Sequence, residues 1–123
     1  MAALRPLVGG TVTVLVPNAD VAVIAPEKVR DYLLSPTHAE GQHKAALFRT
    51  LGYTKVRWQQ LEVDLRGLLS ADAESMDLTK YGRKYLVRGL LGRHPGRRVA
   101  VVTVWIILSG EETPRFVTAY PGD

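Results

Sequence analysis

The final third of the chain contains three runs of β-branched and aromatic residues. These runs are RKYLVRGLL (83–91), RVAVVTVWIIL (98–108) and RFVTAY (115–120), and the turn-rich segments GRHPG and SGEETP separate them. Short Gly- and Pro-rich segments of this kind connect neighbouring antiparallel strands. The sequence therefore predicts a three-stranded antiparallel meander within residues 81–121, to which the alternating segment TVTVLV (11–16) can add a fourth strand.

The part of the chain before the meander has a helical period instead. A first helix is predicted over residues 26–34 and a second from about Glu40 to Leu51, where Gly52 provides a C-terminal stop. VRWQQLEVDLRGLL (56–69) has one apolar stripe and predicts a third helix, followed by the polar connector ADAESMD. The predicted class is α+β, with N-terminal helices packed on one face of a three- to four-stranded antiparallel sheet.

Length and composition limit the remaining possibilities. The chain has 123 residues, of which 46% are hydrophobic and 23% charged, so we expect one domain over residues 1–123. Within it we expect an N-terminal strand and lead-in (1–16), a helical part (26–70) and the meander (81–121). No apolar run approaches the length of a membrane span, and the first ten residues are too weakly apolar for a signal peptide. The chain has no cysteine, which suits a cytoplasmic location.

Positive charge is concentrated in the meander. The formal net charge is +4, yet no acidic residue occurs between Leu78 and Gly110, where seven basic residues fall: Lys80, Arg83, Lys84, Arg88, Arg93, Arg97 and Arg98. A patch of one sign attracts polyanions such as RNA. A solvated basic hairpin that contacts no phosphate has the same sequence, so both interpretations stay open.

The turns also predict how the strands pair. If GRHPG and SGEETP close the two hairpins, Tyr85 lies opposite Thr103, and Thr103 lies near Tyr120. One face then carries hydroxyl, aromatic and guanidinium groups that suit a base and a phosphate: Arg83, Tyr85, Thr103, Trp105, Phe116, Thr118 and Tyr120. The opposite, aliphatic face would support the helices. Thr and Tyr are also common in strands without any ligand, which leaves a purely structural interpretation open.

The segment SPTHAEGQHKAALF (35–48) supplies groups for proton transfer and charge stabilisation. His38 precedes the second predicted helix, and Lys44 lies inside it. A histidine exchanges protons near neutral pH, and a lysine stabilises negative charge on phosphate oxygens, as metal-independent RNA cleavage requires. The alternative is a helix start with a surface lysine. The acidic residues are scattered and no cysteine is present, so we expect neither a metal nor another cofactor.

Three blocks of the sequence resemble a family of small bacterial domains of unknown function. The blocks are DYLLSPTHAEGQHKAALFRTLGY, YGRKYLVRGLLG and VVTVWIILSGEETPRFVTAYP. The family shows YLLxxxHPxGxxKAxFFxxLG, YGxxYxV, GPxGR and VxTxWxxxxxxxPRLVTAYP. Its members occur as C-terminal modules of polymorphic toxins and as stand-alone proteins, and they are similar to the barnase–EndoU–colicin–RelE superfold of metal-independent ribonucleases.

The resemblance implies a ribonuclease-like function and a set of site residues. Its matching positions include His38, Lys44, Tyr85 and Thr118 as catalytic candidates, with substrate contacts at Thr103, Trp105, Arg115 and Tyr120, to which the strand pattern adds Arg83. Two departures stand out: Ala39 replaces the proline of the family's His-Pro, and GRHPGR replaces GPxGR. The expected function is metal-independent RNA cleavage by a toxin domain.

Two other functions stay open at this point. The first is a non-catalytic module that binds RNA or a protein through the basic meander. The second is a protein neutralised by an acidic antitoxin or immunity protein. RNA and an acidic protein are therefore the expected partners, and no contact with a membrane is expected.

Overall fold

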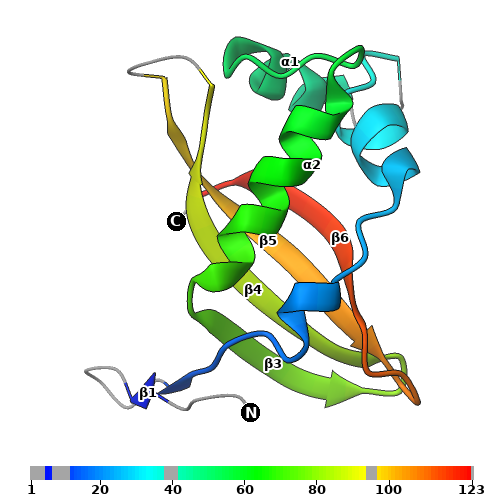
Figure 1. Cartoon of the computed structure of the whole chain (residues 1–123), viewed down its shortest axis with the longest axis vertical. Coiled ribbons are helices and arrows are strands. Elements are labelled where there is room, and N and C mark those ends of the chain that lie inside the picture. Colours follow the sequence, from blue (N-terminus) through cyan, green and yellow to red (C-terminus); the bar gives the residue numbers. More distant parts are fainter. Residues whose placement is uncertain (1–4, 7–11, 38–41, 94–96, 123) are drawn as a thin grey trace.

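The computed structural model describes residues 5–6, 12–37, 42–93 and 97–122. The helical elements are the 3₁₀-helix η1 (Ala19–Val21), the π-helix η2 (Lys28–Leu33), the α-helices α1 (Gln42–Thr50) and α2 (Trp58–Gly67), and the 3₁₀-helix η3 (Leu68–Ser70). The strands are β1 (Arg5–Pro6), β2 (Val12–Thr13), β3 (Ala73–Thr79), β4 (Gly82–Leu91), β5 (Val99–Leu108) and β6 (Pro114–Pro121). In Figure 1, α2 crosses in front of the sheet, and α1 lies at one end of α2.

The main sheet confirms the predicted α+β class. It has four antiparallel strands in the order β3-β4-β5-β6, and the three predicted strands of the meander are β4, β5 and β6. Its fourth strand is β3, so the prediction of a polar connector at residues 71–77 was wrong. The segment around residue 14 contributes only a bridge, in which Val14 and Ala73 exchange two backbone hydrogen bonds. Within the described residues, no helix has the length and apolar character needed to cross a membrane.

The core lies between the helices and one face of this sheet. Its helical side consists of apolar residues from η2, α1 and α2, namely Val29, Leu33, Phe48, Leu61 and Leu65. Its sheet side consists of Ala73, Tyr85, Val87, Leu91, Val101, Trp105, Phe116 and Ala119. Trp105 lies at the centre of this side, because it pairs with Tyr85 on β4 and with Phe116 on β6. The Trp105 and Phe116 rings meet edge to face, with centroids 5.3 Å apart.

The predicted choice of the helix-bearing face was therefore wrong. We expected the helices on the aliphatic face, whereas they cover the face of Tyr85, Thr103 and Trp105. The Thr103 hydroxyl does not need water, because it donates to the Val87 carbonyl (2.8 Å) and accepts from Trp105 Nε1 (2.8 Å). These polar atoms are paired inside the core. Burying the aromatic rings therefore stabilises the fold more than burying smaller aliphatic side chains would.

The predicted pairing of strands needs two corrections. Tyr85 lies opposite Trp105 instead of Thr103, a shift of two residues that leaves its face unchanged. Thr103 lies opposite Ala119 instead of Tyr120, a shift of one residue that turns Tyr120 to the other face. Between the pairs Val104–Thr118 and Trp105–Phe116 the register shifts, because β6 contains a bulge at this point. Turn residues alone give no signal for such a bulge.

The outer edge of β6 is partly covered by the segment that leads into η2. Val23 forms a parallel bridge with Arg115: its N–H donates to the Pro114 carbonyl, and its carbonyl accepts from the Phe116 N–H. Beyond this bridge the chain leaves the strand and winds into η2. The first half of β6 thus has a backbone partner on its outer edge, whereas Thr118 in the second half lies beside Tyr32 of η2 and Lys44 of α1.

We predict that Thr103→Val destabilises the protein by about 1–3 kcal/mol, because it keeps the side-chain shape and leaves the Trp105 indole N–H buried without an acceptor. The measurement is urea unfolding followed by circular dichroism. In a Trp105→Phe background the same substitution is expected to cost less, since no indole N–H is then left unpaired. If Thr103→Val lowered the free energy of unfolding equally in both backgrounds, the Thr103–Trp105 hydrogen bond would contribute nothing to stability.

Candidate functional site

Lys44 is held in a fixed position by two hydroxyl groups. It lies in the first turn of α1, and its Nζ donates to the Tyr32 hydroxyl (2.9 Å) and to the Thr118 hydroxyl (2.8 Å). The same Nζ lies 5.1 Å from the centroid of the Tyr32 ring, a cation–π distance. A lysine ammonium has three donors. Two are used here, and the third has no partner among the described residues.

This ammonium lines a pocket of about 560 Å³, which we call the Lys44 pocket. Its lining residues come from the lead-in to η2, from η2 and α1, and from the free part of the β6 edge: Ala25, Glu27, Lys28, Tyr32, Lys44, Val117 and Thr118. A volume of this size is within the range of small-ligand sites. The described lining residues include two ammonium groups and one carboxylate, so this part of the pocket carries a net positive charge and favours an anion.

The local sequence explains how the three polar groups meet. Val29 and Leu33 anchor η2 in the core, and the Leu34 N–H donates to the Val29 carbonyl, the five-residue spacing of a π-helix. Phe48, one turn after Lys44, anchors α1 in the same core. Tyr32 lies on η2, twelve residues before Lys44. η2 is a π-helix, and π-helical turns are often found at functional sites. The β6 bulge lies between Phe116 and Thr118, and Val117 and Thr118 form the part of the lining that β6 supplies.

Lys44 and Thr118 are thus two predicted catalytic residues that the structure brings together. Three other candidates lie in the core, where Thr103 and Trp105 have no exposed surface and Tyr85 is 7% exposed. Their polar or aromatic groups pack inside the protein and give a substrate no access. The function proposed below therefore assigns them no contact with a substrate.

The remaining candidates lie outside the Lys44 pocket. The Arg83 guanidinium donates to the Met76 carbonyl (2.7 Å) and to the Ser75 hydroxyl (3.3 Å), which ties β4 to the edge strand β3. Arg115 pairs with Glu111 (3.1 Å). Tyr120, near the end of β6, is 38% exposed. His38 lies outside the described residues, so its role stays a prediction.

Sequence reasoning missed Glu27, Lys28 and Tyr32 as site residues. Tyr32 shares a helical face with the buried Val29 and Leu33, so its position indicated packing in the core. No periodic pattern distinguishes a tyrosine whose ring packs from one whose hydroxyl also holds a lysine. Among the described residues, no group of three or more acidic, histidine or cysteine side chains is arranged to hold a metal ion.

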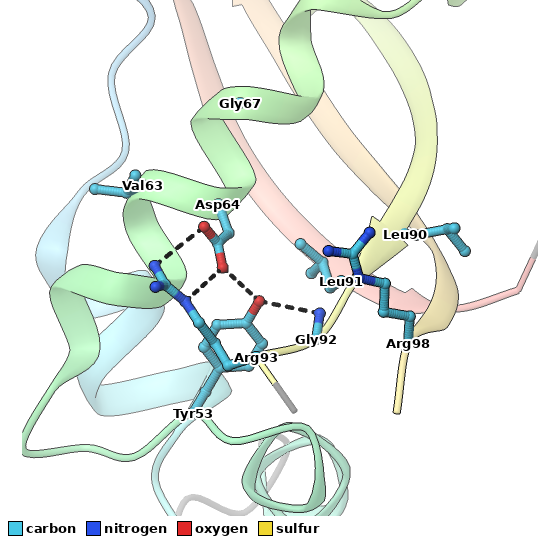
Figure 2. Close-up of a pocket in the computed structure, with 9 residues that line it drawn as sticks. All are labelled: Tyr53, Val63, Asp64, Gly67, Leu90, Leu91, Gly92, Arg93 and Arg98. Carbon is cyan, nitrogen blue, oxygen red and sulfur yellow. Dashed lines mark hydrogen bonds and ion pairs between the residues drawn. The ribbon is translucent and has the colours of Figure 1, made fainter. Parts of the chain in front are cut away.

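A second pocket, of about 530 Å³, lies between α2 and the β4–β5 hairpin (Figure 2). We call it the Arg98 pocket, and its lining residues are Tyr53, Val63, Asp64, Gly67, Leu90, Leu91, Gly92, Arg93 and Arg98. A polar network forms one wall. The Tyr53 hydroxyl donates to Asp64 Oδ2 (2.6 Å) and accepts from the Gly92 N–H (3.2 Å). Arg93 binds both oxygens of Asp64, through Nε (2.9 Å) and Nη2 (3.2 Å).

Burial of Tyr53 raises the pKa of its phenol, and the hydrogen bond to the Asp64 carboxylate raises this pKa further. The native state therefore holds the phenol proton more tightly than the unfolded chain does. This contribution to stability is complete below the ordinary tyrosine pKa of 10.0 and is lost as the pH rises above it.

We predict that the free energy of unfolding of the wild type falls more steeply above about pH 10 than that of Tyr53→Phe, which has no phenol to ionise. Urea unfolding at several pH values between about 8 and 11 measures the difference. Other tyrosines and lysines ionise in both proteins, so the comparison isolates Tyr53. Parallel pH profiles for the two proteins would contradict the prediction.

The chain matches a known family of protein domains. A family model described as a domain of unknown function (DUF6883) matches residues 15–123, which include all the helices that the structure describes and the four strands of the main sheet. Searches of curated proteins and of solved structures gave no significant match. Because the family model covers most of its length, the chain belongs to this family of domains of unknown function.

Proposed function

We propose that the Lys44 pocket binds a phosphodiester of RNA and promotes its cleavage without a metal ion. The observation that carries this proposal is the position of the Lys44 ammonium. Two hydroxyl groups fix it at the wall of an open pocket, and, as far as the described residues go, one of its three donors is left for an anion. Because this cation is already oriented, little reorganisation is needed when negative charge develops on a phosphate oxygen.

The proposed reaction is an internal transfer at phosphorus. The ribose 2′-oxygen loses its proton and forms a bond to phosphorus, while the bond from phosphorus to the 5′-oxygen breaks and the 5′-oxygen takes up a proton. The products are a 2′,3′-cyclic phosphate and a free 5′-hydroxyl. No water, oxidant or metal enters this step. DNA lacks the 2′-hydroxyl and cannot react in this way.

The lining residues have separate proposed roles. Lys44 stabilises the negative charge on the non-bridging phosphate oxygens. Thr118 accepts a hydrogen bond from Lys44, so its own hydroxyl proton can be donated to a phosphate oxygen. Lys28 attracts the neighbouring phosphate of the RNA strand, and Glu27 supplies a carboxylate that can accept a proton. His38 is the second proposed proton-transfer group, six positions before Lys44 in the sequence.

The resemblance of the sequence blocks to toxin modules of the ribonuclease superfold supports the same proposal. In that context the domain would act as a toxin, and the bacterium that makes it would need a protein that neutralises it. The described fold, with helices on one face of a four-stranded antiparallel sheet, is compatible with this class. Because Ala39 stands where the family has proline, the His38→Ala variant below tests whether His38 transfers a proton in this chain.

We predict that the purified protein cleaves a labelled single-stranded RNA in the presence of EDTA, and that Lys44→Met reduces the rate constant by about 10²–10³-fold. This is the usual effect of removing one group that stabilises transition-state charge. Lys80→Met is the matched control, because Lys80 also lies 5.1 Å from a tyrosine ring, that of Tyr81, and carries the same charge outside the pocket. The control should cleave at nearly the wild-type rate.

The products and the other variants decide between the remaining possibilities. A 2′,3′-cyclic phosphate end, and no cleavage of an RNA with 2′-deoxyribose at the cut position, are expected. His38→Ala and Glu27→Gln then show which group transfers the proton, since the variant that lacks it loses the pH dependence of the rate. RNA binding without cleavage by the wild type would refute catalysis and favour a binding module, and equal rates for the two lysine variants would refute the role of Lys44.

A further inference from the structure

We propose that Tyr32 is a positioning residue, which makes Lys44 bind one particular non-bridging oxygen of a phosphodiester in the Lys44 pocket. A phosphodiester has two such oxygens of equal charge, and they differ only in their direction from phosphorus. The inference rests on the phosphodiester named in the proposed function, but not on its cleavage. Tyr32 acts through Lys44 and needs no contact with the phosphate itself.

The Lys44 ammonium has a fixed direction, unlike a lysine on an open surface. A lysine normally binds phosphate as a point charge, because its ammonium turns on a flexible stem. Here Nζ donates to the Tyr32 hydroxyl (2.9 Å) and to the Thr118 hydroxyl (2.8 Å). The four bonds of an ammonium nitrogen are tetrahedral. Once the Cε bond and two N–H bonds are set, the third N–H has only one direction left.

The two acceptor hydroxyls cannot follow the ammonium if it turns away. Each belongs to a different element, and each is carried next to a residue with no exposed surface. Leu33 follows Tyr32 on η2, and Ala119 follows Thr118 on β6. The dense packing of these neighbours holds the backbone on both sides. Turning the ammonium out of this position therefore breaks at least one of its two hydrogen bonds.

The two phosphate oxygens consequently meet different donors. Within the described part of the chain, the third Lys44 N–H is left for one oxygen at the wall of the pocket. The Thr118 hydroxyl accepts from Lys44 and can give its own proton to the other oxygen. Hydrogen bonds from a charged donor are about twice as strong as neutral ones. The pocket thus distinguishes between the two oxygens, and Tyr32 preserves this difference by keeping the charged donor in place.

The experiment uses a uridine dinucleotide in which sulfur replaces one non-bridging oxygen and a 2′-O-methyl group blocks cleavage. The Rp and Sp diastereomers place the sulfur at one oxygen position or at the other. Sulfur is larger than oxygen and accepts hydrogen bonds less well, so one diastereomer loses the hydrogen bond from Lys44. NMR titration of the full chain, followed through the Lys44 Cε signal, should give dissociation constants that differ by about tenfold.

Tyr32→Phe tests the positioning role. The substitution keeps the aromatic ring and removes the hydroxyl, so the ammonium can turn and serve either oxygen. The preference for one diastereomer should fall to about twofold or less, while the affinity for the unmodified dinucleotide changes by less than about threefold, because the charge stays in the pocket. A purely structural role of Tyr32 would weaken the binding of both diastereomers by the same factor and leave the preference intact.

Two further variants complete the comparison. Thr118→Val removes the second acceptor of Lys44 and should reduce the preference in the same way. Tyr81→Phe is the matched control, because the Tyr81 ring also has a lysine nitrogen 5.1 Å from its centroid, that of Lys80, and lies outside the pocket. This control should keep the wild-type preference.

Equal dissociation constants of the two diastereomers for the wild type would overturn the inference, because Lys44 would then act as an undirected charge. An unchanged preference in Tyr32→Phe, an equal loss in Tyr81→Phe, or no binding of either diastereomer would overturn it too. Cleavage is judged separately. A wild type that distinguishes the diastereomers but leaves RNA intact in EDTA would refute the proposed reaction and not this inference, whereas cleavage without a preference between diastereomers would do the opposite.

Discussion

The burial of Trp105 at the centre of the sheet is the interaction on which the other parts of the structure depend. This side chain lies on β5, between Tyr85 on one neighbouring strand and Phe116 on the other, and it is fully buried. Burying an indole ring requires an acceptor for its N–H, which Thr103 supplies from the same strand. The helices cover this aromatic centre, and their positions on it determine where Lys44 and Asp64 lie.

The helices and strands were predicted from the sequence more accurately than the tertiary contacts between them. The strands of the meander were predicted within about one or two residues, because β-branched runs and turn residues are local signals. The helix-bearing face was assigned wrongly, since a threonine hydroxyl gives no sign that a tryptophan on the same strand will pair with it. β3 was missed because AESMDLT has little apolar alternation, and as an edge strand it is mostly exposed.

The candidate site could be predicted only in part, for a related reason. Lys44 and Thr118 were identified, yet they are 74 positions apart, and their contact depends on the β6 bulge and on the course of the chain after Val23. Neither feature follows from turn residues or periodicity. The network around Tyr53 and the exposure of Arg98 were not predicted, because they depend on how the β4–β5 hairpin packs against α2.

The bridge between Val23 and β6 also bears on how this protein can associate with other molecules. It occupies part of the outer edge of β6, and the register shift between Ser75 and Leu78 distorts β3 at the other edge of the sheet. Regular unpaired edges are templates for the addition of a further strand, whereas bulges and covering segments oppose such addition. Intermolecular strand pairing is therefore disfavoured at both edges of the main sheet.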